Sequence, residues 1–195
     1  GNIYIYRPHR MGFLGALLMR NRMAKAWAKH TASEFEEKSV TSTMDTMGGD
    51  PAYVVNVPTC VGGAGKEGIE TFYANKFVGK TPADTTTTSV QVSIDVKAQT
   101  LVEELVMEFT HDIEMPWMLP GVPPSGKKVT VPLVVSVGFN GRCQVVSERV
   151  YWDQASVLQQ VGLLPLDKVE KLPIVGSRQS KTVLDPKREI GARCE

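Results

Sequence analysis

The second half of the chain constrains the fold most, because it contains long segments in which apolar and polar residues alternate. From Val90 to Val96 every second residue is aliphatic, and side chains two positions apart share one face of a strand. The same alternation predicts strands over residues 100–115, 127–139 and 142–153. The last two are joined by Asn140-Gly141, a dipeptide typical of a tight β-hairpin. The pattern after Pro82 therefore predicts an antiparallel sheet.

Helical periodicity dominates the first half. Five residues recur at helical spacing and predict one amphipathic helix over residues 15–38: Ala24, Trp27, Ala28, Thr31 and Phe35. Further helices are expected from Thr43 to Gly48, over 66–77 and over 154–161, with a short strand over 52–57. Ile69, Phe72, Tyr73 and Phe77 form the expected buried stripe of the helix over 66–77.

Helices followed by a run of antiparallel strands are typical of the α+β class. We expect a cone-shaped, curved, mixed or antiparallel sheet with the N-terminal helices packed in its concave face, which leaves a pocket at the open end. Residues 15–164 would form this domain, 1–14 an N-terminal arm and 165–195 a C-terminal tail.

Composition excludes several classes of protein. The chain has 22 Lys+Arg and 21 Asp+Glu residues, so no nucleic-acid partner is expected. Its apolar stretches are too short to span a membrane. The three cysteines lie far apart, without a CxxC pair or Cys/His cluster, so we expect neither a zinc site nor a disulfide framework. The sequence predicts a cytoplasmic protein without metal or cofactor.

The N-terminal 30 residues are basic. They contain six lysines and arginines and no acidic residue. A solvated helix face explains this pattern, and an organellar targeting segment is the alternative.

The segment from Gly63 to Gly68 fits the GxGxxG pattern, but Thr88 stands where a dinucleotide fold needs an acidic residue. We interpret it as a flexible entry into the following helix.

Two residues are candidates for acid/base chemistry. His111 lies on the apolar face of its strand and opposite Asp112 and Glu114, so these three cannot bind one ion. It is either a hydrogen-bonded core residue or a catalyst. Asp153 either caps the helix that begins at Gln154 or is a carboxylate at the mouth of an apolar pocket.

Asp153 shares a polar strand face with Tyr151 and Arg149, whereas Glu148 and Trp152 lie on the opposite face. Alternation does not decide which face points inward. The apolar, proline-rich loop over 115–126 is either a rigid turn or a pocket lid or dimer contact.

Three segments carry a family resemblance. The loop from Gly121 to Lys127 resembles the G-x-P-P-T-G-R loop of SnoaL-like proteins, and the turn from Phe139 to Arg142 resembles their F-x-D-G-K turn. The ending from Tyr151 to Gly162 is similar to their W-D…LL-x-Q-L-G ending, and YWDQASVL resembles a branch common in fungi. SnoaL-like proteins belong to the nuclear-transport-factor-two-like superfamily, which has the α+β cone.

This resemblance implies a cofactor-independent acid/base enzyme and a homodimer formed through the outer sheet face. Characterised relatives include polyketide cyclases, isomerases, dehydratases and epoxide hydrolases. Asp153 matches the aspartate of the cyclases, but Val137 stands at the place of their histidine, which argues against aldol cyclisation. His111 would replace that histidine by position alone.

The sequence thus predicts an isomerase, cyclase, lyase or hydrolase acting on a small hydrophobic molecule such as a polyketide or a terpenoid-like lactone. Asp153, His111 and Tyr151 are the expected catalytic residues. The expected substrate-binding residues are Glu103, Met107, Phe109, Trp117, Arg149, Trp27 and Tyr73. A non-catalytic binding or dimeric scaffold module of the same fold is the alternative.

Overall fold

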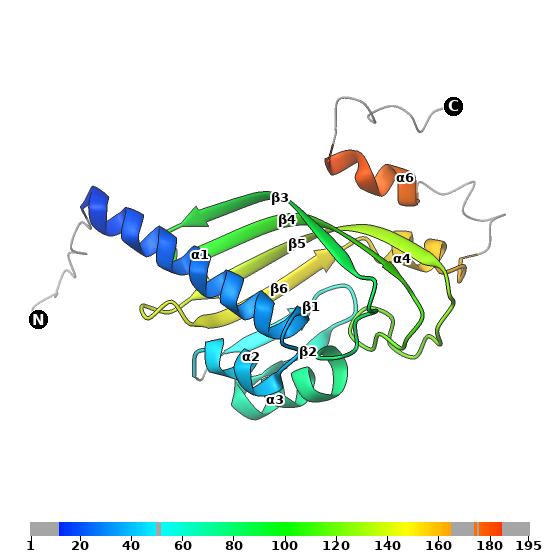
Figure 1. Cartoon of the computed structure of the whole chain (residues 1–195), viewed down its shortest axis with the longest axis horizontal. Helices are drawn as coiled ribbons and strands as arrows, with labels where there is room; N and C mark the ends of the chain where they lie inside the picture. Colours follow the sequence, from blue (N-terminus) through cyan, green and yellow to red (C-terminus); the bar gives the residue numbers. More distant parts are fainter. Residues whose placement is uncertain (1–11, 50–51, 165–173, 175, 185–195) are drawn as a thin grey trace, which may run out of the picture.

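The computed structural model describes residues 12–49, 52–164, 174 and 176–184. A six-stranded sheet with the strand order β2-β1-β6-β5-β4-β3 forms its centre (Figure 1). The strands are β1 (Tyr53–Asn56), β2 (Val61–Ala64), β3 (Thr86–Asp95), β4 (Thr100–Thr110), β5 (Lys128–Phe139) and β6 (Val145–Trp152). Strands β3 to β6 pair antiparallel, as predicted, and β1 joins β6 in parallel. The sheet is therefore mixed.

Strand β2 corrects the interpretation of the glycine-rich segment as a flexible helix entry. Its residues pair antiparallel with β1. A side chain at Gly62 would collide with the backbone of Val54, and one at Gly63 with the backbone of Gly68. The glycines are needed because the backbones approach closely at these positions.

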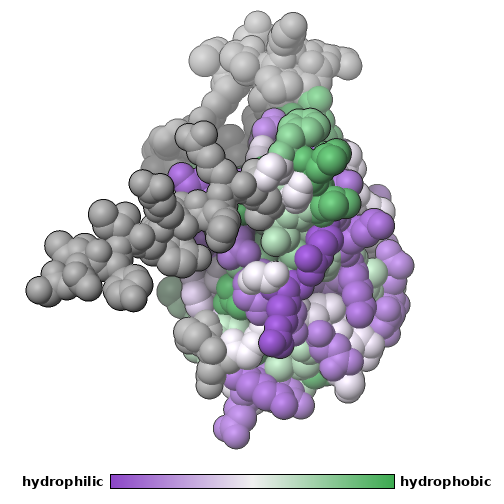
Figure 2. Space-filling view, turned by 90° about the vertical axis from the view of Figure 1, so that its left-hand side faces the viewer, coloured by the Kyte–Doolittle hydropathy of each residue, from purple (hydrophilic) through white to green (hydrophobic). Residues whose placement is uncertain are grey.

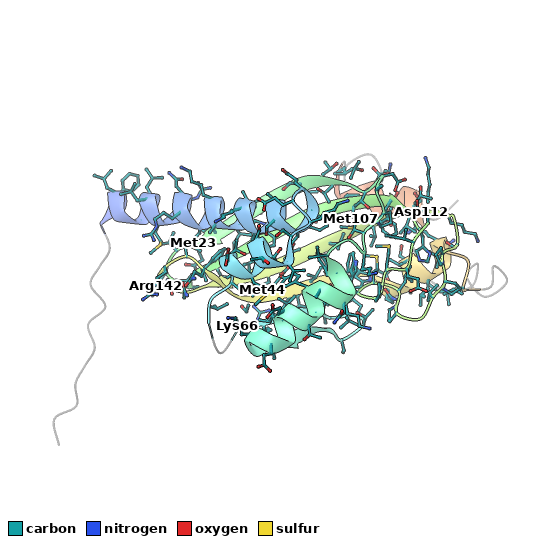
Figure 3. All side chains as sticks on the ribbon, turned by 60° about the horizontal axis from the view of Figure 1, so that its bottom comes forward. Met23, Met44, Lys66, Met107, Asp112 and Arg142 are labelled. Atoms are coloured by element: carbon teal, nitrogen blue, oxygen red, sulfur yellow. The ribbon has the colours of Figure 1, made fainter. Side chains whose placement is uncertain are left out.

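The helices are α1 (Phe13–Phe35), α2 (Val40–Thr46), α3 (Gly65–Phe72), the π-helical η1 (Tyr73–Phe77), α4 (Gln154–Gln160), α6 (Ser177–Ser180) and the short η2 (Lys181–Val183). The first three lie together beside the sheet (Figures 1 and 3). Helix α2 begins where the Ser39 hydroxyl accepts a hydrogen bond from the Ser42 amide at 3.1 Å. The α+β cone with N-terminal helices on one face is confirmed.

The buried face of α1 differs from the predicted stripe. Ala24 and Ala28 are exposed, and the buried positions are Met23, Trp27, His30, Ser33 and Glu34. The buried face of α1 is shifted by about one residue from the predicted stripe. As a result, a histidine and a glutamate face the sheet.

Alternation along the strands decides which side chains enter the interior. On β5 the odd-numbered positions from Val129 to Phe139 are buried. On β6 the buried face carries Glu148, Val150 and Trp152, whereas Tyr151 is exposed. The register places Val135 beside Val150 and Glu103. One continuous inner surface therefore includes two acidic residues.

The described part of the predicted tail lies on the other face of the sheet. The Ser177 hydroxyl donates to the Thr130 hydroxyl at 3.1 Å, and Lys181 forms a salt bridge with Glu108 at 2.6 Å. Thr130 belongs to the even-numbered face of β5, opposite the interior. Most of the predicted arm 1–14 and tail 165–195 lies outside the described residues.

Apolar residues gather where α1 begins (Figure 2). The exposed ones are Phe13, Leu14, Leu17 and Leu18. No described helix is both long and apolar enough to cross a membrane.

Candidate functional site

A cavity of about 290 Å³ lies between α1 and the inner surface of the sheet. Its apolar wall consists of Trp27, Ala32, Phe35, Phe77, Leu105, Met107, Trp117, Leu133, Val135 and Val150. Its polar wall includes Asn56, Glu34, Glu36, Glu103 and Glu148. An apolar pocket with a few polar groups of this size is typical of a small-molecule site.

Two of these glutamates belong to a buried cluster that also contains His30 and Tyr73. His30 Nε2 lies 3.1 Å from Glu34 Oε1 and 3.5 Å from Glu148 Oε2. The Tyr73 hydroxyl lies 3.2 Å from the same nitrogen and donates to Glu148 Oε2 at 3.3 Å. Glu34 is one helical turn after His30 on α1, so the helix itself brings these two side chains together.

Hydrogen bonds on the far side of the ring fix the protonation of His30. The Thr46 hydroxyl donates to the carbonyl oxygen of Thr43 at 2.6 Å, so it accepts from His30 Nδ1–H at 2.5 Å. Nε2 faces the carboxyl oxygens of Glu34 and Glu148, which would repel its lone pair. A proton on Nε2 is attracted to these oxygens instead, which favours the charged imidazolium. Burial alone would lower the pKa of His30, but Glu34 and Glu148 outweigh it and raise the pKa to about 10.

Glu34 is the carboxyl group that most readily holds a second proton. Burial raises its pKa, and the attraction of His30 opposes this only in part. Its Oε1 is buried and lies 3.1 Å from His30 Nε2, so the imidazolium N–H faces it. Burial also raises the pKa of Tyr73 well above its ordinary value. Two glutamates and one imidazolium therefore lie in contact at the wall of an apolar cavity.

His30, Glu34 and Glu148 are also the one group of potential metal ligands found among the described residues. Their ligand atoms all lie within 4.8 Å of one another. Nitrogen and carboxylate ligands of this kind suit zinc and related ions. An Nε2 proton and a metal ion compete for the same place, and a metal analysis distinguishes them.

A second polar contact links the cavity to the cluster. Trp27 Nε1 donates to Glu103 Oε2 at 2.6 Å, and the Trp27 ring stacks on His30 with 5.5 Å between ring centroids. Trp27 therefore fixes Glu103 on one side and His30 on the other.

The structure brings several predicted binding residues to the cavity. Trp27, Glu103, Met107 and Trp117 line it. Tyr73 joins the His30 cluster behind it. Whether they bind a substrate stays a prediction.

Two other predicted binding residues lie elsewhere. Phe109 is buried in the core but does not line the cavity. Arg149 lies on the outer face of β6 and donates to the Tyr53 hydroxyl at 2.7 Å and the Ser136 hydroxyl at 3.1 Å.

The three predicted catalytic residues do not line the cavity either. The Asp153 carboxylate caps α4, accepting from the amides of Ala155 at 3.0 Å and Ser156 at 3.3 Å. Tyr151 is exposed on the outer sheet face. The sequence pattern left open which face of β6 points inward. In the structure, Arg149 and Tyr151 lie on the outer face, and Glu148 lies on the inner face and lines the cavity.

His111 is buried and holds the proline-rich loop. Its Nδ1 accepts from the Ser125 amide at 3.3 Å and lies 3.1 Å from the Ser125 hydroxyl. Its carbonyl oxygen accepts from the amides of Ser125 and Gly126. Burial lowers its pKa, and Asp112 opposes this only in part. These contacts favour the structural alternative for His111.

His30, Glu34 and Glu148 were not predicted from the sequence. Two features of the sequence nevertheless indicate that they are buried together. His30 and Glu34 stand four residues apart on a helix, and Glu148 is a single acid among the apolar residues of one strand face. A lone acid on an apolar face needs a buried partner.

No protein-family model matches the chain, and no curated protein matches it in sequence. Solved structures do match. A phenazine biosynthesis-related protein from Pseudomonas aeruginosa has a TM-score of 0.59 at 12% identity, covering 80% of this chain and 94% of its own. A Jannaschia protein described as a SnoaL-like polyketide cyclase has a TM-score of 0.55 at 17% identity, covering 74% and 94%.

A third match is a hypothetical protein with a ketosteroid isomerase-like fold from Catenulispora acidiphila, whose structure contains trimethylamine. It has a TM-score of 0.51 at 19% identity, covering 74% of this chain and 95% of its own. The expected fold is thereby confirmed. This chain has the α+β cone fold that SnoaL-like and ketosteroid isomerase-like proteins share.

Proposed function

We propose that the chain is a cofactor-independent acid/base enzyme that acts on a small, largely apolar molecule bound in the cavity. The observation that carries this proposal is the pair of carboxyl groups, Glu34 and Glu148, on the cavity wall in contact with one buried imidazolium. Pairs of carboxyl groups whose surroundings differ are the usual means of acid/base chemistry near neutral pH. Isomerisation, cyclisation, elimination and hydrolysis all need such a proton transfer.

Each member of the cluster has a distinct role in the proposal. Glu34 transfers the proton, because its pKa is raised and it lines the cavity beside the His30 imidazolium. Glu148 accepts the Tyr73 hydroxyl hydrogen and lines the cavity beside Glu34. His30 and Tyr73 are positioning residues, since they act through the two carboxyl groups.

A turnover screen tests the proposal. Wild type and Glu34→Gln are incubated with a panel of lactones, epoxides, enones and β-hydroxy ketones, and products are followed by mass spectrometry. The proposal expects turnover by wild type and a loss of about 100- to 10,000-fold in Glu34→Gln. Equal turnover by both proteins would contradict the role of Glu34.

The competing function is a non-catalytic binding module. The size of the cavity and its apolar wall favour it equally, because they suit a ligand without chemistry. A ligand that binds tightly and is recovered unchanged, with no turnover on the panel, would favour this function.

We also propose that the chain forms a homodimer through the outer sheet face. Val102, Val134 and Tyr151 are exposed on that face, and the register places Val134 beside Tyr151. Size-exclusion chromatography with light scattering is expected to give twice the 21.4 kDa chain mass. A monomer at micromolar concentration would refute it.

A further inference from the structure

The charge of the cavity wall is strongly one-sided. Four glutamates line it, and among the described lining residues there is no lysine or arginine. His30 compensates part of this charge from behind Glu34 and Glu148. Helix α1 ends at the cavity with Phe35 and has no basic residue in its last turn. The negative end of the helix dipole therefore adds to the carboxyl groups.

Glu103 is the less exposed of the two cavity-lining glutamates outside the His30 cluster, since Glu36 is exposed. It is half-buried on β4, and its Oε2 accepts the hydrogen bond of the Trp27 indole at 2.6 Å. In the described part of the chain, no basic side chain forms a salt bridge with it. A carboxylate in an apolar wall without a cation is costly, and a positively charged ligand would remove that cost.

Aromatic rings supply the second part of a cation site. Phe35 and Phe77 have ring centroids 5.6 Å apart, and Phe77 and Trp117 have centroids 5.2 Å apart. Together with Trp27 they line the cavity. Aromatic faces attract ammonium groups, most strongly where water is excluded.

Asn56 supplies an unused acceptor on the same surface. It is 1% exposed, and its Nδ2 donates to the Val61 carbonyl oxygen at 3.0 Å. Its Oδ1 is buried without a hydrogen-bond partner. The register aligns Asn56 with Val150, Val135 and Glu103 across the sheet. The inner surface therefore offers acceptors at both ends of one row and an apolar middle.

We propose that the cavity selects organic cations, namely a substrate with a protonated or quaternary amine joined to an apolar body, and that Glu103 recognises the positive charge. The proposal rests on the proposed function in that it names the substrate class of the same cavity. Anionic substrates, such as carboxylates and phosphate esters, are disfavoured, because the described cavity wall contains glutamates and no lysine or arginine.

Three probes of similar shape and different charge test this selectivity. Benzyltrimethylammonium, its uncharged isostere neopentylbenzene and the anion phenylacetate are titrated against the full chain. Trp27 and Trp117 line the cavity, so intrinsic fluorescence reports binding, with calorimetry as a second readout. The proposal expects the cation to bind about tenfold more tightly than the isostere, and the anion most weakly.

Two variants locate the effect. Glu103→Gln keeps an oxygen that accepts from Trp27 and is expected to lose the preference for the cation by about tenfold. Glu104→Gln, on the opposite face of β4, is the matched control and keeps it. An equal affinity for cation and isostere, no binding of the cation, or an unchanged preference in Glu103→Gln would each overturn the proposal.

The cation site and the proposed enzymatic function can be refuted independently of each other. Selective binding that depends on Glu103 and persists in Glu34→Gln, together with no turnover on an amine-containing panel, would leave the cation site intact and refute the enzyme. Turnover of neutral substrates at the same rate in wild type and in Glu103→Gln would support the enzyme and refute the cation site.

Discussion

His30 and His111 are both completely buried, yet their surroundings change their proton affinity in opposite directions. Glu34 and Glu148 overcome the effect of burial and raise the pKa of His30 to about 10. His111 accepts a backbone hydrogen bond from Ser125, and burial lowers its pKa. In this fold, nearby carboxyl groups therefore decide whether a buried histidine gains or loses proton affinity.

The largest expected effect concerns activity. Glu34→Gln removes the transferable proton but resembles the protonated side chain, so the protein should remain folded while kcat falls by about 100- to 10,000-fold. Glu37→Gln, an exposed glutamate just beyond α1, is the matched control and should keep full activity. His111→Gln should also keep most of it. A greater loss in His111→Gln than in Glu34→Gln would reverse the comparison.

The next effect concerns stability. His30→Ala leaves two buried carboxyl groups without their cation, and the free energy of unfolding should fall by about 3–5 kcal/mol. His111→Ala loses one hydrogen-bonded side chain and should cost about 1–3 kcal/mol. Urea unfolding followed by circular dichroism measures both. If His30→Ala does not fold, His30→Gln supplies the same comparison with a smaller change in volume. Equal losses at both sites would show that the carboxyl groups add nothing.

The pH dependence of stability follows from three pKa shifts, those of His30, Glu34 and His111. The pKa of His30 is 6.5 when unfolded and about 10 when folded, so its stabilisation is complete below pH 6.5 and is lost as the pH rises toward 10. This stabilisation is on the order of a few kcal/mol. The raised pKa of Glu34 acts in the same direction from its ordinary value of 4.5 upward. The lowered pKa of His111 acts oppositely, costing stability as the pH falls below 6.5.

Unfolding measured across this pH range should show a decline in wild type that is smaller in His30→Gln, where only the raised pKa of Glu34 still contributes. A wild-type protein whose stability is constant between pH 6.5 and 10 would contradict the charged cluster.

A smaller effect is expected at Asp153. Asp153→Ala removes the cap of α4 and should lower the free energy of unfolding by about 1 kcal/mol, without a change in kcat. A loss of activity as large as that of Glu34→Gln would restore Asp153 as the catalytic carboxylate.

The smallest effect is expected from metal removal. If a proton occupies the position between His30, Glu34 and Glu148, dialysis against a chelator leaves activity and melting temperature unchanged. Elemental analysis that finds one equivalent of zinc or manganese, lost together with activity, would assign the cluster to a metal ion.

The sequence predicted the fold well because alternation and the Asn140-Gly141 turn are local signals. It could not predict the rotation of α1, because Ala24 and Ala28 are small enough to remain exposed at little cost, which allows His30 and Glu34 to face the sheet. It also left open which face of β6 points inward, because the face with Glu148 and the face with Arg149 both carry charge. Only tertiary packing, which pairs Glu148 with His30, decides this.

Nuclear magnetic resonance of the imidazole groups shows directly whether His30 is a buried imidazolium. The chain has three histidines, so His30→Gln and His111→Gln suffice to assign the signals. The His30 ring is expected to be charged throughout the neutral range and to titrate near pH 10, while His111 titrates below 6.5. A His30 ring that is neutral at pH 7 would contradict this expectation.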